Sequence, residues 1–257
     1  MRLARARKWV LRPLIVVLTP IVLVVGWNFV TANFATVQPD RVYRSGQMHG
    51  WGLARTIHDQ KIKTVLNLRG HHPEQPWYRA ERAATLAAGA AQVDIALSSC
   101  EWMSRTQMRT LVDVLLTSDT PILIHCWRGA ERTGLASAFL TLLKDGSTLE
   151  DARAAFSIKY LFVRAGDGVV TIEHFEQYEA WLKTNGLTHS PTVFRRWANE
   201  GYVPGKPGRE QWPYDPFPLV VFTRDTPDGP VERKVWDDRG RPSSPIADRR
   251  PKAAALR

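Results

Sequence analysis

The residues of this chain most able to do chemistry lie in one segment, ILIHCWRGAERTG, at positions 122–134. An apolar run leads into a loop that starts at Cys126, and a helix-forming stretch follows the loop. Backbone N–H groups and partial positive charge at a helix N-terminus make such a loop a cradle for phosphate. The same field favours the thiolate form of a cysteine, so Cys126 can act as a nucleophile.

Three of the residues that follow Cys126 in the sequence strengthen this interpretation. Arg132 follows after five intervening residues and can bind two phosphate oxygens with its guanidinium fork. Gly129 permits a tight backbone approach, and Thr133 can hydrogen-bond the cysteine sulfur. If Cys126 were only a buried structural residue, there would be no reason for these three residues to follow it. The predicted phosphate-binding loop is Cys126, Trp127, Arg128, Gly129, Ala130, Glu131 and Arg132.

Strand-like and helix-like segments alternate around this loop, which indicates a layered α/β domain. Short apolar runs predict strands, and apolar residues at helical spacing predict helices, with Ser104 as an N-cap. The predicted strands cover residues 64–68, 92–97 and 121–125, and the predicted helices cover residues 78–91, 104–116, 133–144, 148–156 and 172–184.

The pattern His125-Cys126-x5-Arg132-Thr133-Gly134 resembles the signature loop of the protein tyrosine and dual-specificity phosphatase superfamily. The stretches VYRSGQ at 42–47 and TVLNLR at 64–69 are similar to a bacterial dual-specificity-like group. The resemblance covers roughly residues 37–187. It implies a central twisted sheet flanked by helices, a phosphocysteine intermediate, no metal and no cofactor. It also implies that His125 supports the loop.

The resemblance further implies a general acid, usually an aspartate about thirty residues before the cysteine. The matching loop, SSCEWM at 98–103, contains no aspartate, so Glu101 is the candidate for protonating the leaving group. Asp94 has the right separation, but we expect it inside a strand as a structural carboxylate. Cys100 lies on the same loop, either as an unrelated thiol or as a partner for a reversible disulfide with Cys126.

The charge distribution argues against nucleic acid as a partner. The formal net charge is +10, but residues 1–12 carry +5, residues 13–187 carry +1 and residues 188–257 carry +4. A nucleic-acid-binding domain would need a basic face on its folded core. His71 and His72 have no further ligand at metal-binding spacing, so we predict no metal site.

A basic flank and a long apolar run open the chain. Residues 13–30 are almost wholly apolar, and eighteen helical residues span about 27 Å, close to the hydrocarbon core of a bilayer. A cleaved signal peptide ending near Val30-Thr31-Ala32 and a buried core helix are the alternatives to a retained anchor. We favour the anchor, with the catalytic domain on the periplasmic or extracytoplasmic side of the membrane.

Four regions follow from these patterns. Residues 1–36 are the flank and transmembrane signal anchor, and residues 37–187 are the catalytic domain. Residues 188–240 form a small extension, and residues 241–257 a disordered tail. Because 11 of the 17 prolines lie after residue 187, we expect this region to be mostly non-helical, with two strands around the turn at 226–230.

The sequence therefore predicts a membrane-anchored, cysteine-dependent phosphomonoesterase. Its expected substrate is an envelope phospholipid or glycolipid phosphate, or a phosphoprotein. An inactive phosphate-binding module of the same fold is the alternative, motivated by the missing aspartate. A sulfur-transfer or arsenate enzyme with the same loop is disfavoured by the Arg-Thr-Gly ending at 132–134.

Overall fold

The computed structural model describes residues 16, 18–20, 22–205 and 218–235. Its strands are β1 (Ala35–Gln38), β2 (Val42–Ser45), β3 (Thr64–Asn67), β4 (Ala91–Ile95), β5 (Ile122–His125), β6 (Val220–Arg224) and β7 (Val231–Val235). They form one sheet in the order β1-β2-β5-β3-β4-β6-β7. The four middle strands run parallel, and β1, β6 and β7 pair antiparallel with their neighbours.

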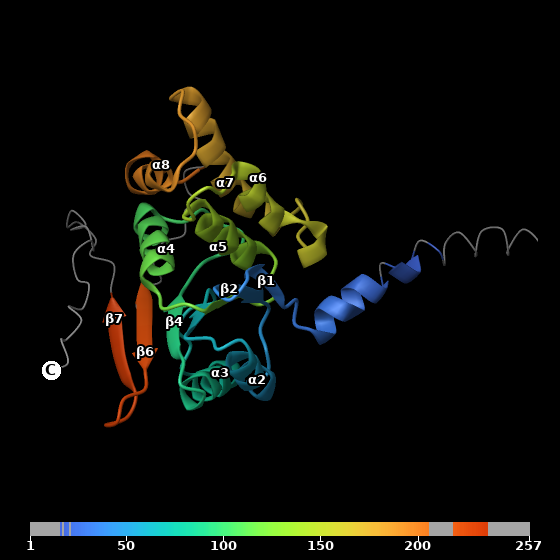
Figure 1. The fold of residues 1–257 in the computed structure, drawn as a ribbon, viewed down its shortest axis with the longest axis vertical. Coiled ribbons are helices and arrows are strands. Elements are labelled where there is room, and N and C mark those ends of the chain that lie inside the picture. The colour runs from blue at the N-terminus through green and yellow to red at the C-terminus, as the bar shows by residue number, and fades with distance from the viewer. Residues whose placement is uncertain (1–15, 17, 21, 206–217, 236–257) are drawn as a thin grey trace, which may run out of the picture.

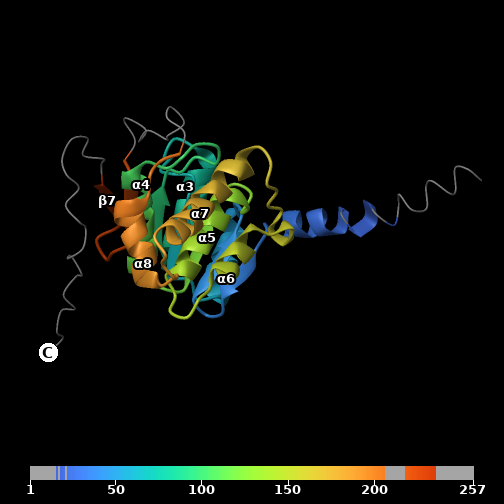
Figure 2. The ribbon, with the colours of Figure 1, turned by 90° about the horizontal axis from the view of Figure 1, so that it is seen from above.

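Helices cover both faces of this sheet (Figure 1; Figure 2). One face carries α2 (Gly50–Asp59) and α3 (Pro76–Ala87). The other face carries α4 (Arg105–Thr117), α5 (Glu131–Leu142), α6 (Leu149–Arg153), α7 (Asp167–Thr184) and α8 (Pro191–Arg196). The predicted α/β class, a central sheet flanked by helices, is confirmed.

Local sequence explains why these elements form where they do. All residues of β2, β3 and β5 are buried, as expected for parallel strands that are covered on both faces. Helix α4 begins after Ser104, whose hydroxyl accepts from the backbone N–H of Gln107, while the Gln107 side chain accepts from the Ser104 N–H. The predicted N-cap is therefore confirmed, together with a full capping box.

The region after residue 187 is more closely integrated than the predicted extension. Strand β6 pairs with β4 in a register that places Val220 opposite Ile95 and Thr223 opposite Gln92. Strand β7 then pairs with β6 and completes the sheet. Trp197 is fully buried in the main core beside Phe139 and Tyr178. The two predicted strands are present, and α8 is followed by a π-helical turn at Trp197–Gly201. The predicted disordered tail lies outside the described residues.

The predicted anchor lies partly outside the described residues, because residues 1–15, 17 and 21 are not described. Residues 22–30 form a helix, called the N-terminal helix here, which projects away from the domain in both views (Figure 1; Figure 2). Among the described residues, no helix has both the length and the apolarity needed to span a membrane. Strand β1 starts at Ala35, so the folded domain begins slightly before the predicted boundary at residue 37.

Candidate active site

The candidate loop begins at the centre of the sheet. Strand β5 lies between β2 and β3, and Cys126 follows its last residue directly. Because β2, β5, β3 and β4 are parallel, their carboxyl ends meet at one edge of the sheet, where parallel α/β sheets bind ligands. The chain then enters α5 at Glu131, so the predicted strand–loop–helix passage is confirmed.

Three successive carbonyl groups of the loop bind donors that lie outside it. The Trp127 carbonyl accepts from the backbone N–H of Gln47 at 3.0 Å. The Arg128 carbonyl accepts from Nδ2 of Asn33 at 3.0 Å, and the Gly129 carbonyl accepts from Nη2 of Arg44 at 2.7 Å. In a trans peptide the carbonyl and the following N–H point in opposite directions. Holding the carbonyls outward therefore turns the N–H groups toward the interior of the loop.

The cysteine sulfur is buried and accepts a hydrogen bond from one loop N–H. The donor is the Gly129 nitrogen, 3.3 Å from Sγ of Cys126. Loop N–H groups and the N-terminus of α5 together supply positive potential at this position. The arrangement can stabilise an anionic sulfur and the oxygens of a bound phosphate.

Close backbone packing requires glycine at two positions. Gly129 has φ +73°, and a Cβ there would lie 2.5 Å from the Gly46 nitrogen and 2.6 Å from the Ser45 carbonyl carbon. A Cβ on Gly46 would in turn lie 3.0 Å from the Trp127 oxygen. The end of β2 and the loop are therefore in direct backbone contact, which confirms the predicted need for glycine at position 129.

Arg132 is oriented by the ends of two strands. Its Nη1 donates to the carbonyl oxygens of Leu68 and Leu97, at 3.3 Å and 3.0 Å. Its Nε is buried and has no hydrogen-bond partner within the described part of the chain. A guanidinium fixed on one side and free at Nε suits a phosphate bound in the loop.

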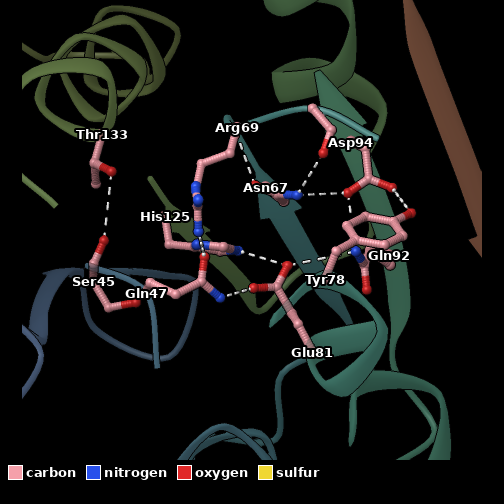
Figure 3. A network of polar contacts seen from close by, with 11 residues as sticks. Ser45, Gln47, Asn67, Arg69, Tyr78, Glu81, Gln92, Asp94, His125 and Thr133 are labelled. Carbon is pink, nitrogen blue, oxygen red and sulfur yellow. Dashed lines mark hydrogen bonds and ion pairs between the residues drawn. The ribbon is translucent and has the colours of Figure 1, made fainter. Parts of the chain in front are cut away.

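A buried polar network supports the loop from the α3 side (Figure 3). Nε2 of His125 lies 3.2 Å from Oε1 of Glu81, and the Gln47 amide donates to the other oxygen of Glu81. The side-chain amide oxygen of Gln47 (Oε1) accepts from Nη1 of Arg69 at 2.7 Å. The guanidinium of Arg69 also stacks over the rings of Trp77 and Trp127. His125 thus has the supporting position that the resemblance implied, with Glu81 as its partner.

Asp94 belongs to a structural cluster of buried polar side chains on β3, α3 and β4. It is buried in β4, where it accepts from the Tyr78 hydroxyl, the Asn67 amide and the Gln92 amide (Figure 3). Burial raises the pKa of Asp94 to about 7, and the three donors partly oppose that rise. Its predicted structural role agrees with this position.

The loop that carries the candidate acid is anchored at its far end. The Met103 N–H donates to Nε2 of His174, and the Met103 carbonyl accepts from the Tyr202 hydroxyl at 2.7 Å. Burial lowers the pKa of His174 to about 4, so its neutral ring accepts this bond at neutral pH. Glu101 is half-exposed on this loop, and its role as the acid stays a prediction.

The remaining predicted site residues occupy different environments. Trp127 and Arg128 are exposed at the mouth of the loop, Ala130 is buried, and Glu131 is half-exposed at the start of α5. The hydroxyl of Thr133, which we expected to contact the sulfur, instead donates to the Ser45 carbonyl at 3.4 Å. Within the residues that the structure describes, no three His, Cys, Asp or Glu side chains are arranged to hold a metal.

Sequence reasoning missed three residues that hold the loop: Asn33, Arg44 and Glu81. Arg44 is fully buried beneath the loop, and burial lowers its pKa to about 10. Glu81 shares the buried face of α3 with Tyr78 and Thr85. A carboxylate on the buried face of a helix is a sequence signal that could have revealed it. No local pattern marks Asn33, because its partners are 95 and 127 residues away.

Comparisons with known proteins agree with this site. The model of a tyrosine phosphatase family matches residues 27–148, which extend from the N-terminal helix to just beyond α5. This match supports membership of the protein tyrosine and dual-specificity phosphatase superfamily, whose members are hydrolases of phosphoric monoesters. A comparison with curated proteins gives no match.

Several solved structures are similar to this chain. The catalytic core of the Saccharomyces cerevisiae PP-IP phosphatase SIW14 is 22% identical, over 62% of this chain and 96% of that one, with a TM-score of 0.44. TpbA of Pseudomonas aeruginosa is 17% identical, over 56% of this chain and 84% of that one, with a TM-score of 0.43. PTPMT1 is 15% identical, over 59% of this chain and 99% of that one, with a TM-score of 0.42. The family assignment rests on the family model and the loop sequence.

Proposed function

We propose that the protein is a phosphomonoesterase that works through a phosphocysteine intermediate formed on Cys126. The observation that carries this proposal is the binding of the carbonyls of Trp127, Arg128 and Gly129 by donors outside the loop, together with the Gly129 N–H that donates to the buried sulfur. Arg132 is the phosphate clamp, and Glu101 is the candidate acid.

The proposed reaction has two steps. The Cys126 thiolate attacks phosphorus and forms a P–S bond while the P–O ester bond breaks, and Glu101 gives its proton to the leaving oxygen. Water then attacks phosphorus and gives a proton to the Glu101 carboxylate while the P–S bond breaks, which releases inorganic phosphate and restores the thiolate. Arg132 and the loop N–H groups stabilise the charge on the three non-bridging oxygens in both steps.

Hydrolysis of an activated aryl phosphate by the full chain tests the proposal. An aryl leaving group needs little protonation, so turnover should not depend on Glu101. We expect turnover that persists with a chelator, and rapid acid quenching should trap one phosphate on the peptide that contains Cys126. Reduced, folded protein that binds inorganic phosphate but shows no turnover would favour the inactive binding module instead.

The N-terminal segment supports a second part of the proposal, attachment to a membrane with the domain on the periplasmic or extracytoplasmic side. Val22, Phe29 and Val30 have apolar side chains that are 65%, 87% and 82% exposed on a helix pointing away from the domain (Figure 1). The basic residues before position 13 favour a cytoplasmic location for the chain start. We expect the full chain to resist carbonate extraction from membranes, and complete release would refute attachment.

A membrane-attached domain meets phosphates of the bilayer at high effective concentration. We therefore propose an envelope phospholipid or glycolipid phosphate as the first substrate class, and a phosphoprotein as the second. Phosphate release from vesicles with a phosphomonoester lipid should exceed release from phosphotyrosine and phosphoserine peptides at equal phosphate concentration. Activity on the peptides alone would overturn the lipid assignment.

A further inference from the structure

The N-terminal helix is joined to the catalytic loop without a flexible linker. Its last turn continues through hydrogen bonds from the N–H groups of Thr31 and Asn33 to the carbonyls of Trp27 and Asn28. The Ala32 carbonyl then accepts from the Gly46 N–H at 2.6 Å. Gly46 lies against the loop backbone, so the helix ends directly on the segment that supports the loop.

Asn33 makes the contact with the loop itself. Its side chain is 3% exposed, and Nδ2 donates to the carbonyls of Arg128 at 3.0 Å and Tyr160 at 2.9 Å. Its φ of +53° lies in the left-handed region, which asparagine tolerates better than most residues. Both hydrogens of one amide are thus used to join three segments that are distant in sequence.

The Arg128 carbonyl belongs to the peptide unit that contacts the nucleophile. The N–H on the other side of the same peptide plane is that of Gly129, which donates to the Cys126 sulfur at 3.3 Å. Because the peptide is planar, holding its oxygen fixes the direction of its N–H. Arg44 and Gln47 hold the neighbouring carbonyls from the β2 side, whereas Asn33 holds this one from the end of the N-terminal helix.

We propose that Asn33 is a positioning residue for the catalytic loop, so that the N-terminal helix end is part of the catalytic machinery. The hydrogen bonds of the Asn33 side chain go to backbone carbonyls, and it acts by keeping the Gly129 N–H directed at Cys126. The proposal rests on the proposed function of the Cys126 loop. It also implies that a protein beginning at residue 37 would lack one of the three donors that orient the loop.

Asn33→Gly in the full chain removes the amide while allowing the left-handed backbone. Asn33→Asp keeps the shape but places carboxylate oxygens against two carbonyl oxygens. We expect Asn33→Gly to lower kcat on an aryl phosphate by roughly 10- to 100-fold, and Asn33→Asp to lower it at least as much. Asn28→Ala is the matched control and should keep wild-type kcat, because the Asn28 side-chain amide donates to the Val24 carbonyl within the helix, and the substitution keeps the backbone carbonyl that accepts from the Asn33 N–H.

Alkylation of Cys126 by iodoacetamide separates positioning from a purely structural role and does not depend on turnover. Peptide mass analysis distinguishes Cys126 from Cys100. Loss of the N–H···S bond removes a contact that orients the sulfur and stabilises its anionic form, so the alkylation profile of Cys126, followed over time at one pH, should be slower in the Asn33 variants than in the wild type. Folded Asn33 variants with an unchanged alkylation profile and an unchanged kcat would overturn the proposal. Asn33 variants that lose thermal stability but keep the wild-type alkylation profile would also overturn it. A wild type without turnover would refute the proposed function, and the alkylation profiles would still decide the role of Asn33.

Discussion

Replacing Cys126 by serine is expected to lower kcat on an activated aryl phosphate by roughly 10⁴-fold or more. The hydroxyl fills nearly the same buried space, but it stays protonated at neutral pH and cannot attack phosphorus as an anion. Arg132 and the loop N–H groups remain in place, so inorganic phosphate should still bind. Steady-state kinetics and calorimetric titration with phosphate would measure the two effects separately.

Cys100→Ser is the matched control for this substitution. Cys100 is exposed, and its sulfur lies 3.4 Å from the hydroxyl of Ser98 on the same loop. Kinetics of this variant should differ from the wild type by no more than about twofold. If both serine variants kept wild-type turnover, Cys126 would not be the nucleophile. If only Cys100→Ser lost activity, the assignment of the two thiols would be reversed.

Replacing Arg132 by lysine is expected to lower kcat/KM by roughly 10²- to 10³-fold, although the positive charge is kept. The guanidinium bonds the carbonyls of Leu68 and Leu97 with one nitrogen and leaves Nε for the phosphate. A lysine ammonium carries its three donors on one nitrogen, so it cannot reach both strand ends and a phosphate in this geometry. Steady-state kinetics with the aryl phosphate, together with thermal unfolding to verify the fold, would check this result.

Arg128→Lys offers a comparison within the same loop. The Arg128 side chain is exposed, and its contact with Asn33 is made by the backbone carbonyl, which the substitution preserves. We therefore expect a loss of activity at least tenfold smaller than that of Arg132→Lys. Equal losses in the two variants would mean that the loop needs its total charge and not a clamp at position 132.

Local patterns in the sequence were sufficient for most elements of the fold. The strand at β5, the loop and helix α5 lie within twenty-one consecutive residues, so one short segment contains the nucleophile, the glycine and the clamp. The capping box at the N-terminus of α4 is formed by Ser104 and Gln107, which lie within four consecutive residues. Such features depend on contacts between neighbours in the chain, which is why apolar spacing and capping residues predict them.

Contacts over long sequence separations were not predictable in the same way. Val220 and Ile95 pair in the sheet although 125 residues separate them, so a strand of the expected C-terminal extension lies in the main sheet. Glu81 approaches His125 from 44 residues away, and Thr133 binds the Ser45 carbonyl instead of the sulfur. These partners are chosen by how the layers pack, and packing is a property of the whole chain.

The sequence by itself determined the chemistry of this protein: a thiol at the end of a buried strand, a glycine-containing loop and an arginine at the start of a helix. Tertiary structure alone decided how the loop is held, because the donors that turn its carbonyls outward come from Asn33, Arg44 and Gln47. Reactive side chains can be recognised by type and spacing. The direction of a backbone N–H depends on which distant group binds the carbonyl of the same peptide, and only the folded chain brings those groups together.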